Sequence, residues 1–317
     1  MLGRELEKFL NNHNMKITHN QFLLKQNDII LRLAEMYGEV MHLRTSMEFE
    51  ESGDYLYMKQ TIFIGYDERE KLAADVCAHS IRRRSHGDLE IKYLKHKPLR
   101  KAGLFNREWK VCGDNGQTID ALDGKPFSTE FSHTRFLVPE LMHFGGWALF
   151  MDCDMIFTSN AAKLFKLADP KYAVMCVKHK HQVVENSKKM DGRLQQNYYR
   201  KNWSSFVLWN CGHPANQGIT RDVVNTADGS DMHRFFWLKD EEIGELPFSY
   251  NYISGVSPLL GTYIDKNGKQ KPVLPDVIHY TEGGPWFDNY KNVPFGDLWE
   301  IEHRSWREDG ELGGEVA

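Results

Sequence analysis

The sequence predicts an α/β fold with a mixed, mostly parallel sheet flanked by helices. Short apolar runs, which are typical of buried strands, alternate with segments of helical periodicity. The first run, Thr61-Ile62-Phe63-Ile64, is followed by a helix and a second strand, the order of a parallel βαβ unit. Two of the runs end in acidic residues, at Asp67 and Asp152. Sheets of this kind bind ligands beyond the carboxyl ends of their strands.

The predicted elements follow one another from residue 61. The strand over 61–64 leads through Gly65-Tyr66-Asp67 into a helix over 68–84, which has Leu72, Val76 and Ile81 on one face. A helix over 134–144 precedes the apolar run over 147–151, which opens after Gly145-Gly146. Further strands are predicted at 89–94, 172–177, 205–209 and 273–279. We find no internal repeat.

Residues 1–57 differ from the rest of the chain in their pattern of apolar residues. They predict a helical appendage and linker, ahead of a main domain over 58–317. Apolar residues between Phe22 and Leu43 recur at three- and four-residue spacings, which predicts an amphipathic helix over about 20–45. An apolar stripe of that length must be buried against other apolar surface, because exposed patches of this size promote association. We therefore expect residues 1–57 to pack on the main domain or to join two copies in a homodimer.

Composition narrows the class of protein. The mean hydropathy is -0.55 and no 18-residue apolar stretch occurs, so we expect no transmembrane segment. The five cysteines are odd in number and lack a Cys-x-x-Cys pair, which argues against zinc fingers and disulfide frameworks. The charged start at Met1–Glu7 has no apolar signal core, so we expect a cytoplasmic protein.

Charge is unevenly distributed along the chain. The net charge of -4 is not that of a polyanion binder. Basic segments nevertheless occur at 82–84, 92–101 and 178–201, whereas the tail over 300–315 is acidic. Each basic segment is either a solvated surface or part of an electropositive rim for a phosphate-bearing substrate.

Asp152-Cys153-Asp154 is the most informative motif. Alternate side chains of an extended segment share a face, so Asp152 and Asp154 are expected to point one way and Cys153 the other. Two carboxylates at the end of a buried strand repel each other unless a cation lies between them. Oxygen-rich sites of this kind suit Mg²⁺ or Mn²⁺. The alternative is a polar strand end that faces water.

Four segments in order resemble the GT-A glycosyltransferases, and within them family 8, which includes glycogenin and bacterial lipopolysaccharide galactosyltransferases. They are Ile62–Asp67, Thr134–Leu141 leading into Phe150–Asp154, Leu246–Asn251, and Val277–Trp286. The resemblance covers about 60–300. It implies a GT-A type fold and transfer of a sugar from a nucleotide-sugar donor with retention. It also implies that Asp152, Asp154 and His279 ligate Mn²⁺, with Mg²⁺ possible; one imidazole beside two carboxylates favours Mn²⁺.

The same resemblance assigns donor-binding residues. Tyr66 and Asp67 correspond to positions that bind the nucleotide base, and Arg135 to an arginine near the nucleotide. Gly283 and Gly284 would let the backbone approach the diphosphate, next to Trp286. The family usually has a lysine before Pro-Trp, where this chain has Gly284, so Lys178 or Lys180 is a candidate for the missing cation.

The sugar and acceptor sides complete the predicted site. Asp240 and Glu241 resemble an acidic–amide pair near the reacting carbon, although the family has Gln where this chain has Glu241. A carboxylate there could stabilise an oxocarbenium-like centre or attack it. Asn251 belongs to the motif over 246–251 and is assigned to substrate binding. An aromatic and amide-rich stretch could line the acceptor pocket or be core: Trp203, Ser204, Ser205, Trp209, Asn210 and His213.

The acceptor stays open at this point: a saccharide, a lipid-linked sugar or a nucleic acid. A transferase that glycosylates nucleic acid bases would use the basic segments to grip phosphates. A non-catalytic module that binds nucleotide-sugars is the remaining alternative. The expected convergence of Asp152, Asp154 and His279 argues against a catalytically inactive domain.

Overall fold

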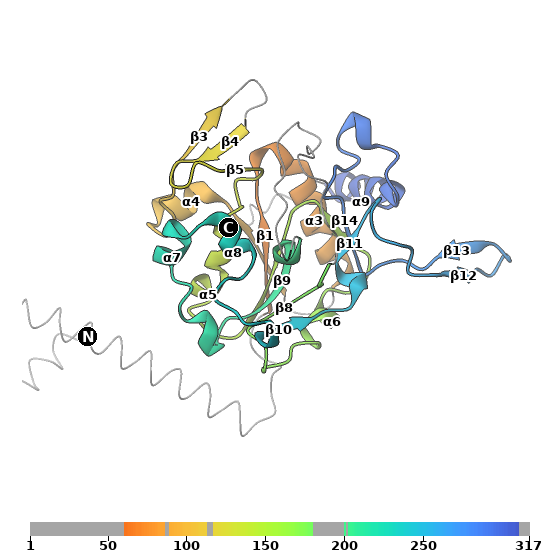
Figure 1. Cartoon of the computed structure of the whole chain (residues 1–317). Helices are drawn as coiled ribbons and strands as arrows, with labels where there is room; N and C mark the ends of the chain where they lie inside the picture. The colour runs from red at the N-terminus through yellow and green to blue at the C-terminus, as the bar shows by residue number, and fades with distance from the viewer. Residues whose placement is uncertain (1–59, 86–88, 113–116, 180–199, 201, 311–317) are drawn as a thin grey trace, which may run out of the picture. The chain divides into compact units, whose positions relative to one another are not determined.

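The computed structural model describes residues 60–85, 89–112, 117–179, 200 and 202–310. The predicted appendage over 1–57 lies outside these ranges, and so does Lys180. The described part begins with the first strand of the main domain (Figure 1). No described helix combines the length and apolar character needed to cross a membrane.

A six-stranded sheet forms the centre, in the order β10-β8-β9-β6-β1-β2. β1 pairs in parallel with β2 and β6, and β10 in parallel with β8, whereas β9 runs antiparallel to both β6 and β8. The predicted mixed, mostly parallel sheet is therefore confirmed. The strands are β1 (Gln60–Gly65), β2 (Leu89–Leu94), β6 (Trp147–Met151), β8 (Val174–Cys176), β9 (Phe206–Asn210) and β10 (Ile243–Glu245).

A second sheet, in the order β11-β14-β7, continues from the edge where β6 ends. β7 (Met155–Phe157) follows the Asp152–Asp154 turn and pairs antiparallel with β14 (Val277–His279), which pairs in parallel with β11 (Tyr252–Ile253). The strand predicted over 273–279 is thus real only over its last three residues. Two small antiparallel sheets complete the set: β3 (Trp109–Cys112), β4 (Gln117–Asp120) and β5 (Pro126–Phe127), and β12 (Thr262–Ile264) with β13 (Gln270–Pro272).

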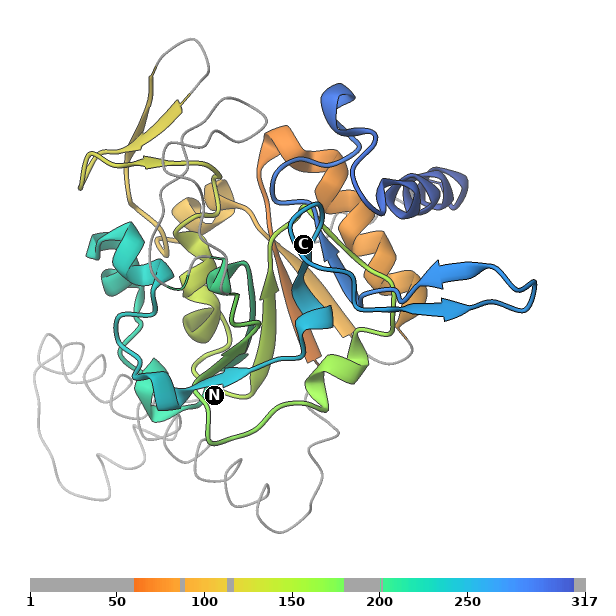
Figure 2. The same ribbon diagram turned by 45° about the vertical axis from the view of Figure 1, so that its right-hand side comes forward.

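Helices cover both faces of the central sheet (Figure 2). α3 and α9 lie on one face and α5, α7 and α8 on the other. The predicted helix over 68–84 is confirmed, but its first turn is the 3-10 helix η1 (Glu68–Glu70), capped by Asp67. The α-helices are α3 (Lys71–Arg84), α4 (His96–Lys101), α5 (Val138–Leu141), α6 (Ala162–Phe165), α7 (Arg221–Thr226), α8 (Gly229–His233) and α9 (Gly296–Glu308).

The remaining 3-10 helices sit at the ends of strands and helices. They are η2 (Thr134–Leu137), η3 (Trp203–Ser205), η4 (Pro214–Asn216), η5 (Asp240–Glu242), η6 (Phe248–Asn251) and η7 (Asp288–Tyr290). The helix predicted over 134–144 is η2 followed by α5. It ends early because His143 and Phe144 adopt positive φ angles, of 50° and 52°, ahead of Gly145-Gly146.

The core is built by the strands of the central sheet. The side chains of Ile62, Leu149 and Phe150 are fully buried, and Trp209 stacks parallel to Trp237 with an interplanar angle of 4°. Both neighbours of the central strand β6 are strands, and helices cover its two faces, so it reads as an unbroken apolar run. This burial makes the carboxyl end of β6 a rigid base for the Asp152–Asp154 turn.

Candidate active site

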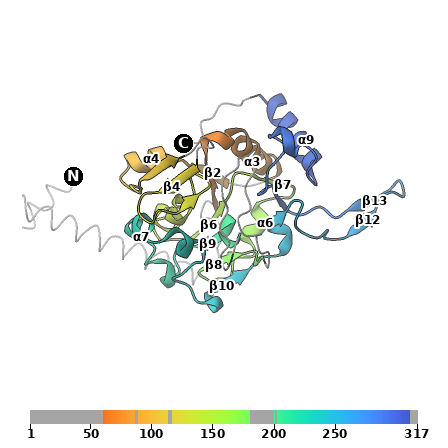
Figure 3. The same ribbon diagram turned by 45° about the horizontal axis from the view of Figure 1, so that its top comes forward.

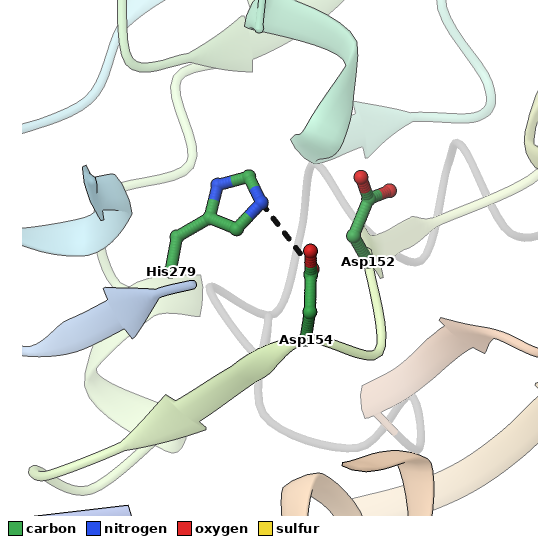
Figure 4. A group of neighbouring side chains, drawn as sticks. All are labelled: Asp152, Asp154 and His279. Atoms are coloured by element: carbon green, nitrogen blue, oxygen red, sulfur yellow. Dashed lines mark ion pairs between the residues drawn. The ribbon is translucent and has the colours of Figure 1, made fainter. Parts of the chain in front are cut away.

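Asp152 and Asp154 lie in the turn between β6 and β7, with their carboxylates on the same side of the chain (Figure 4). Cys153 points the other way: it is fully buried and its thiol donates to Glu70 Oε2 at 3.2 Å. Burial first, and the Glu70 carboxylate second, raise the pKa of the Cys153 thiol well above its usual value. The thiol therefore stays protonated, and the two carboxylates alone face the site from this turn.

His279 completes a three-residue cluster from the second sheet. It is the last residue of β14, where it pairs with Met155, the residue after Asp154. Its Nε2 lies 3.2 Å from Asp154 Oδ1. One potential ligand atom from each of Asp152, Asp154 and His279 lies within 4.8 Å of the others. Three residues from two segments separated by more than a hundred positions thus converge at one sheet edge.

A chain of buried hydrogen bonds sets the tautomer of His279. Ser205 Oγ donates to Asn202 O at 2.7 Å, so it accepts from Asn251 Nδ2 at 3.0 Å. The amide oxygen of Asn251 then faces His279 Nδ1 at 2.9 Å, and Nδ1 must carry the proton. The Nε2 lone pair is therefore directed at the cluster, as in metal-ligating histidines that donate through their other nitrogen.

Asn251 was predicted to bind substrate, but it is fully buried behind His279. Its contact is with the imidazole, so the structure corrects the predicted contact. The buried amide acts as the positioning group for a candidate ligand. The tight 3-10 turn η6, between β10 and β11, brings Asn251 there, and the sequence carried no signal for this partner.

Arg135 contacts both Asp152 and the backbone of Ser204. Its Nη1 is 2.9 Å from Asp152 Oδ1 and 2.9 Å from the backbone oxygen of Ser204. The guanidinium also stacks over the rings of Phe131 and Phe150. Arg135 is buried, so it offsets one of the two negative charges and holds Asp152 in place. A contact with the nucleotide stays a prediction.

The three side chains fit a divalent cation. With Nδ1 protonated, the Nε2 lone pair of His279 faces a carboxylate oxygen of Asp154, which is an arrangement of two acceptors. Such an arrangement is favourable only when a proton or a cation lies between them. Two carboxylates and one imidazole form a donor set that suits Mn²⁺.

The loop after His279 passes close to other parts of the chain at its two glycines. Gly283 has a φ of 143°, and a Cβ there would meet the ring of Tyr290 at 2.6 Å. A Cβ on Gly284 would lie 1.9 Å from the ring of Trp286. Trp286 packs on Tyr280 and Trp299. The glycines are thus required for this loop to fold back beside His279, whatever it binds.

A cavity of about 420 Å³ opens beside β11, and none of Asp152, Asp154 and His279 is among its lining residues. One of its lining residues, Ile253, is the strand partner of His279. Lys178 and Glu245 bring opposite charges to the lining, from beyond β8 and from the end of β10. The full lining is Lys178, His179, Glu245, Phe248, Ile253, Val256, Ser257 and Pro258. Lys178, one of the two cations proposed from the sequence, therefore lines this cavity, and its contact with a diphosphate stays a prediction.

Tyr66 and Asp67 follow β1 at the same edge of the sheet. The Tyr66 ring is buried beneath Lys95, whose Nζ lies 4.8 Å from the ring centroid. Burial, with the nearby Glu68 carboxylate, raises the pKa of Tyr66 to about 12. Asp67 is fully buried and accepts hydrogen bonds from the Arg69 side chain and from the backbone N–H of Glu130. Contacts of Tyr66 and Asp67 with a nucleotide stay predictions.

The structure does not bring Asp240 and Glu241 to the cluster. They lie in η5, just before β10 begins at Ile243. The strand registers align Ile243, across β8 and β9, with Ala148 near the start of β6, whereas Asp152 follows the end of β6. Asp152 therefore lies at the opposite end of the strands, roughly 15–20 Å away along the strand direction alone. Asp240 pairs instead with Arg200. The predicted catalytic placement of this pair is corrected.

Asn210 is at that opposite end as well. It pairs with Trp147 at the start of β6, and its amide donates to the backbone oxygens of Pro170 and Tyr172. Trp209 is core. Ser204 and Ser205, in η3 just before β9, do reach the cluster edge, where the Asp152 N–H donates to Ser205 O, because β9 runs antiparallel to β6. Sequence reasoning missed this reversal, and it also missed Glu245, a carboxylate at the correct end of β10.

Comparisons with known proteins agree with the fold. The chain is 44% identical to Protein CDI of Arabidopsis thaliana over 256 residues, which cover 81% of this chain and 90% of that protein. No model of a protein family matches the chain. The solved apo structure of the WbbM bifunctional glycosyltransferase superposes with a TM-score of 0.50 at 13% identity, over 80% of this chain.

The chain spans about half of the WbbM chain, 51%. A structure of LgtC superposes with a TM-score of 0.48 at 13% identity, over 78% of this chain and 96% of that one. The likeness to WbbM concerns the fold alone, and it confirms the GT-A type architecture predicted from the sequence.

Proposed function

The chain belongs to the same family as Protein CDI of Arabidopsis thaliana. We propose that it is a metal-dependent glycosyltransferase with a nucleotide-sugar donor. The observation that carries the proposal is the convergence of Asp152, Asp154 and His279 at the carboxyl edge of a GT-A type sheet. The motif order supports a placement near family 8, with retention of anomeric configuration.

Mn²⁺ is the metal we propose, with Mg²⁺ as the second choice. When bound, the ion would neutralise the negative charge that develops on the departing diphosphate. Asp152 and Asp154 would hold it from one turn and His279 from the other sheet. Arg135 and Asn251 keep Asp152 and His279 in position through the 2.9 Å contacts described above. These two groups are buried, so the geometry exists before the donor arrives.

The donor and the acceptor would lie on the same edge. We propose that the glycine loop over 283–286 and Lys178 contact the diphosphate, with Tyr66 and Asp67 on the nucleotide side. The cavity of about 420 Å³ beside β11 has the size and the mixed lining of a sugar pocket. Glu245 supplies the carboxylate in the lining of this cavity. We therefore propose Glu245, in place of Asp240 and Glu241, as the residue that contacts the sugar.

The test is release of nucleoside diphosphate from a panel of nucleotide-sugars, with Mn²⁺, Mg²⁺ or a chelator. We expect one donor to be hydrolysed or transferred in the presence of Mn²⁺, and chelation to stop the reaction reversibly. Asp154→Ala and His279→Ala should each lower the rate at least about a hundredfold, because each loses a ligand of the ion. Asp240→Ala, at the other end of the sheet, is the matched control and should keep the rate.

Full activity in excess chelator would refute metal dependence. The anomeric configuration of the product, read by NMR, tests retention separately. Absence of turnover with every donor, together with tight nucleotide binding, would favour a non-catalytic module instead.

A further inference from the structure

A β-hairpin projects from the main domain between β11 and β14, the strand that ends at His279. The chain leaves β11, forms the antiparallel pair β12 and β13, and returns to β14, which ends at His279. The hairpin extends away from the body of the domain in three views (Figures 1, 2 and 3). Its root lines the cavity described above, through Val256, Ser257 and Pro258.

The tip of the hairpin is a hydrogen-bonded turn. The Asp265 carboxylate accepts from the backbone N–H groups of Asn267 and Lys269, both at 2.9 Å. Gly268 has a φ of 74°, which suits the left-handed position of such a turn. At the other end of the pair, Val273 N–H donates to Gly261 O. The hairpin therefore presents its side chains in a defined arrangement.

The hairpin and its root concentrate exposed apolar side chains. Twelve large hydrophobic residues are exposed in the described part of the chain, and six of them lie between positions 256 and 274. Ile264 is 66% exposed and Tyr263 52%. Single exposed hydrophobic residues are ordinary, but a cluster of this kind marks an interaction surface. The six are Val256, Leu259, Tyr263, Ile264, Val273 and Leu274.

The same segment is positively charged. Between 256 and 274 the chain has three lysines, at 266, 269 and 271, and one acidic residue, Asp265, a local charge of +2 in a protein of net charge -4. The Asp265 carboxylate is turned inward to the backbone of the tip. Lys271 lies directly opposite Tyr263 in the strand pair. Apolar and aromatic side chains interleaved with lysines are complementary to an anionic lipid surface.

We propose that this hairpin seats the protein on an anionic membrane surface. Tyr263 would enter the boundary between headgroups and acyl chains on the face that it shares with Lys271, while the lysines remain on the lipid phosphates. The hairpin would stay shallow, because the unpaired backbone groups of its two edges need water or headgroups. The proposal goes beyond the transferase activity and does not depend on it.

A second copy of the chain fits the hairpin less well. Pairing of two β13 strands would place Lys271 and Lys269 of one copy near those of the other, which is repulsive. Pro272 offers no N–H to a new ladder, and proline with lysine is a common protection of an edge strand. Charge complementarity therefore favours lipid.

Sedimentation with vesicles tests the proposal, with the full chain and without donor or metal. We expect binding to vesicles of phosphatidylcholine with phosphatidylserine, and much weaker binding to phosphatidylcholine alone. Replacing Lys266, Lys269 and Lys271 together by Gln should weaken partitioning roughly a hundredfold, from about fivefold for each lysine. Tyr263→Ser with Ile264→Ser should weaken it by at least about tenfold.

The matched control replaces Lys97, Lys101 and Lys110 by Gln. These exposed lysines lie in or near α4 and β3, on the other side of the domain from the hairpin (Figure 1). The control has the same change of charge and should keep vesicle binding. Circular dichroism of every variant verifies folding, and donor hydrolysis tests the transferase separately.

Three results would overturn the proposal. The first is a full chain that does not bind anionic vesicles, and the second is a control that loses as much binding as the hairpin variants. The third is a wild-type dimer, by light scattering, that the hairpin variants convert to monomer while vesicle binding is absent. The hairpin would then be an interface between copies.

Discussion

At the scale of single residues, a buried amide controls which nitrogen of His279 carries a proton. Asn251 Oδ1 accepts from Nδ1 at 2.9 Å, and the Ser205 hydroxyl orients the amide. Without this acceptor the imidazole can change tautomer or rotate, and a ligand held less rigidly binds metal less tightly. Outer partners of ligating histidines commonly contribute 10–100-fold to metal affinity.

We therefore expect Asn251→Ala to weaken Mn²⁺ binding by about 10–100-fold, as measured by EPR of free Mn²⁺. Asn251→Asp keeps an acceptor for Nδ1–H and should stay within a few-fold of the wild type. This pair separates loss of the hydrogen bond from loss of packing at a fully buried position. Unchanged affinity in Asn251→Ala would show that the amide does not position the ligand.

Glu245 and Glu241 flank the same short strand at its two ends, which makes them a matched pair. Only Glu245 lines the cavity beside β11. Glu245→Gln should lower kcat by at least about tenfold with little change in the donor KM, the pattern of an interaction made mainly in the transition state. Glu241→Gln should leave both constants unchanged. The reverse result would restore the sequence-based assignment of Glu241.

At the scale of elements, a buried carboxylate fastens α9 to α3. The Glu302 side chain is fully buried and lies 2.6 Å from both His79 and Arg84 and 3.2 Å from Arg83. His79 also contacts Asp309 at 2.8 Å. The basic run over 82–84, which the sequence left open as a phosphate-binding rim, is thus largely engaged in joining two helices.

Glu302→Ala should destabilise the protein by about 3 kcal/mol, at the lower end for a broken buried ion pair, because Arg83 and Arg84 are partly exposed. Urea unfolding measures the change. Glu300→Ala, on the exposed side of the same helix, should change the free energy of unfolding by no more than about 0.5 kcal/mol. Equal effects of the two substitutions would contradict a fastening role for Glu302.

At the scale of the whole molecule, the cluster is assembled entirely from residues after position 150, and the first strand begins at Gln60. The catalytic unit as proposed therefore needs no ligand from residues 1–57. The apolar stripe from Phe22 to Leu43 is instead expected to mediate dimerisation or to brace the acceptor side.

If the full chain is a dimer, a chain starting at Met58 should become a monomer, and otherwise it should lose transfer to the acceptor; in both cases it should keep metal-dependent donor hydrolysis. Light scattering and a transfer assay on the same preparation measure the two outcomes. A truncated chain with the oligomeric state and the transfer rate of the full chain would show that residues 1–57 neither mediate dimerisation nor support acceptor binding.

The sequence by itself determined the class of fold, most strands of the central sheet and the two neighbouring carboxylates of the cluster. These follow from local causes: apolar runs bury as strands, and alternate carboxylates share a face. His279 was found only through the resemblance of an ordered set of motifs, since a lone histidine at a strand end carries no such information.

Only the tertiary structure decided which polar residues lie near the cluster of Asp152, Asp154 and His279. Asp240, Glu241 and Asn210 lie at the far end of the sheet because β9 runs antiparallel and because η5 precedes β10 instead of following it. The role of Asn251 depends on a hydrogen bond across 28 residues. Strand direction and long-range pairing are set by how the whole sheet buries its apolar faces, and no local pattern of residues specifies them.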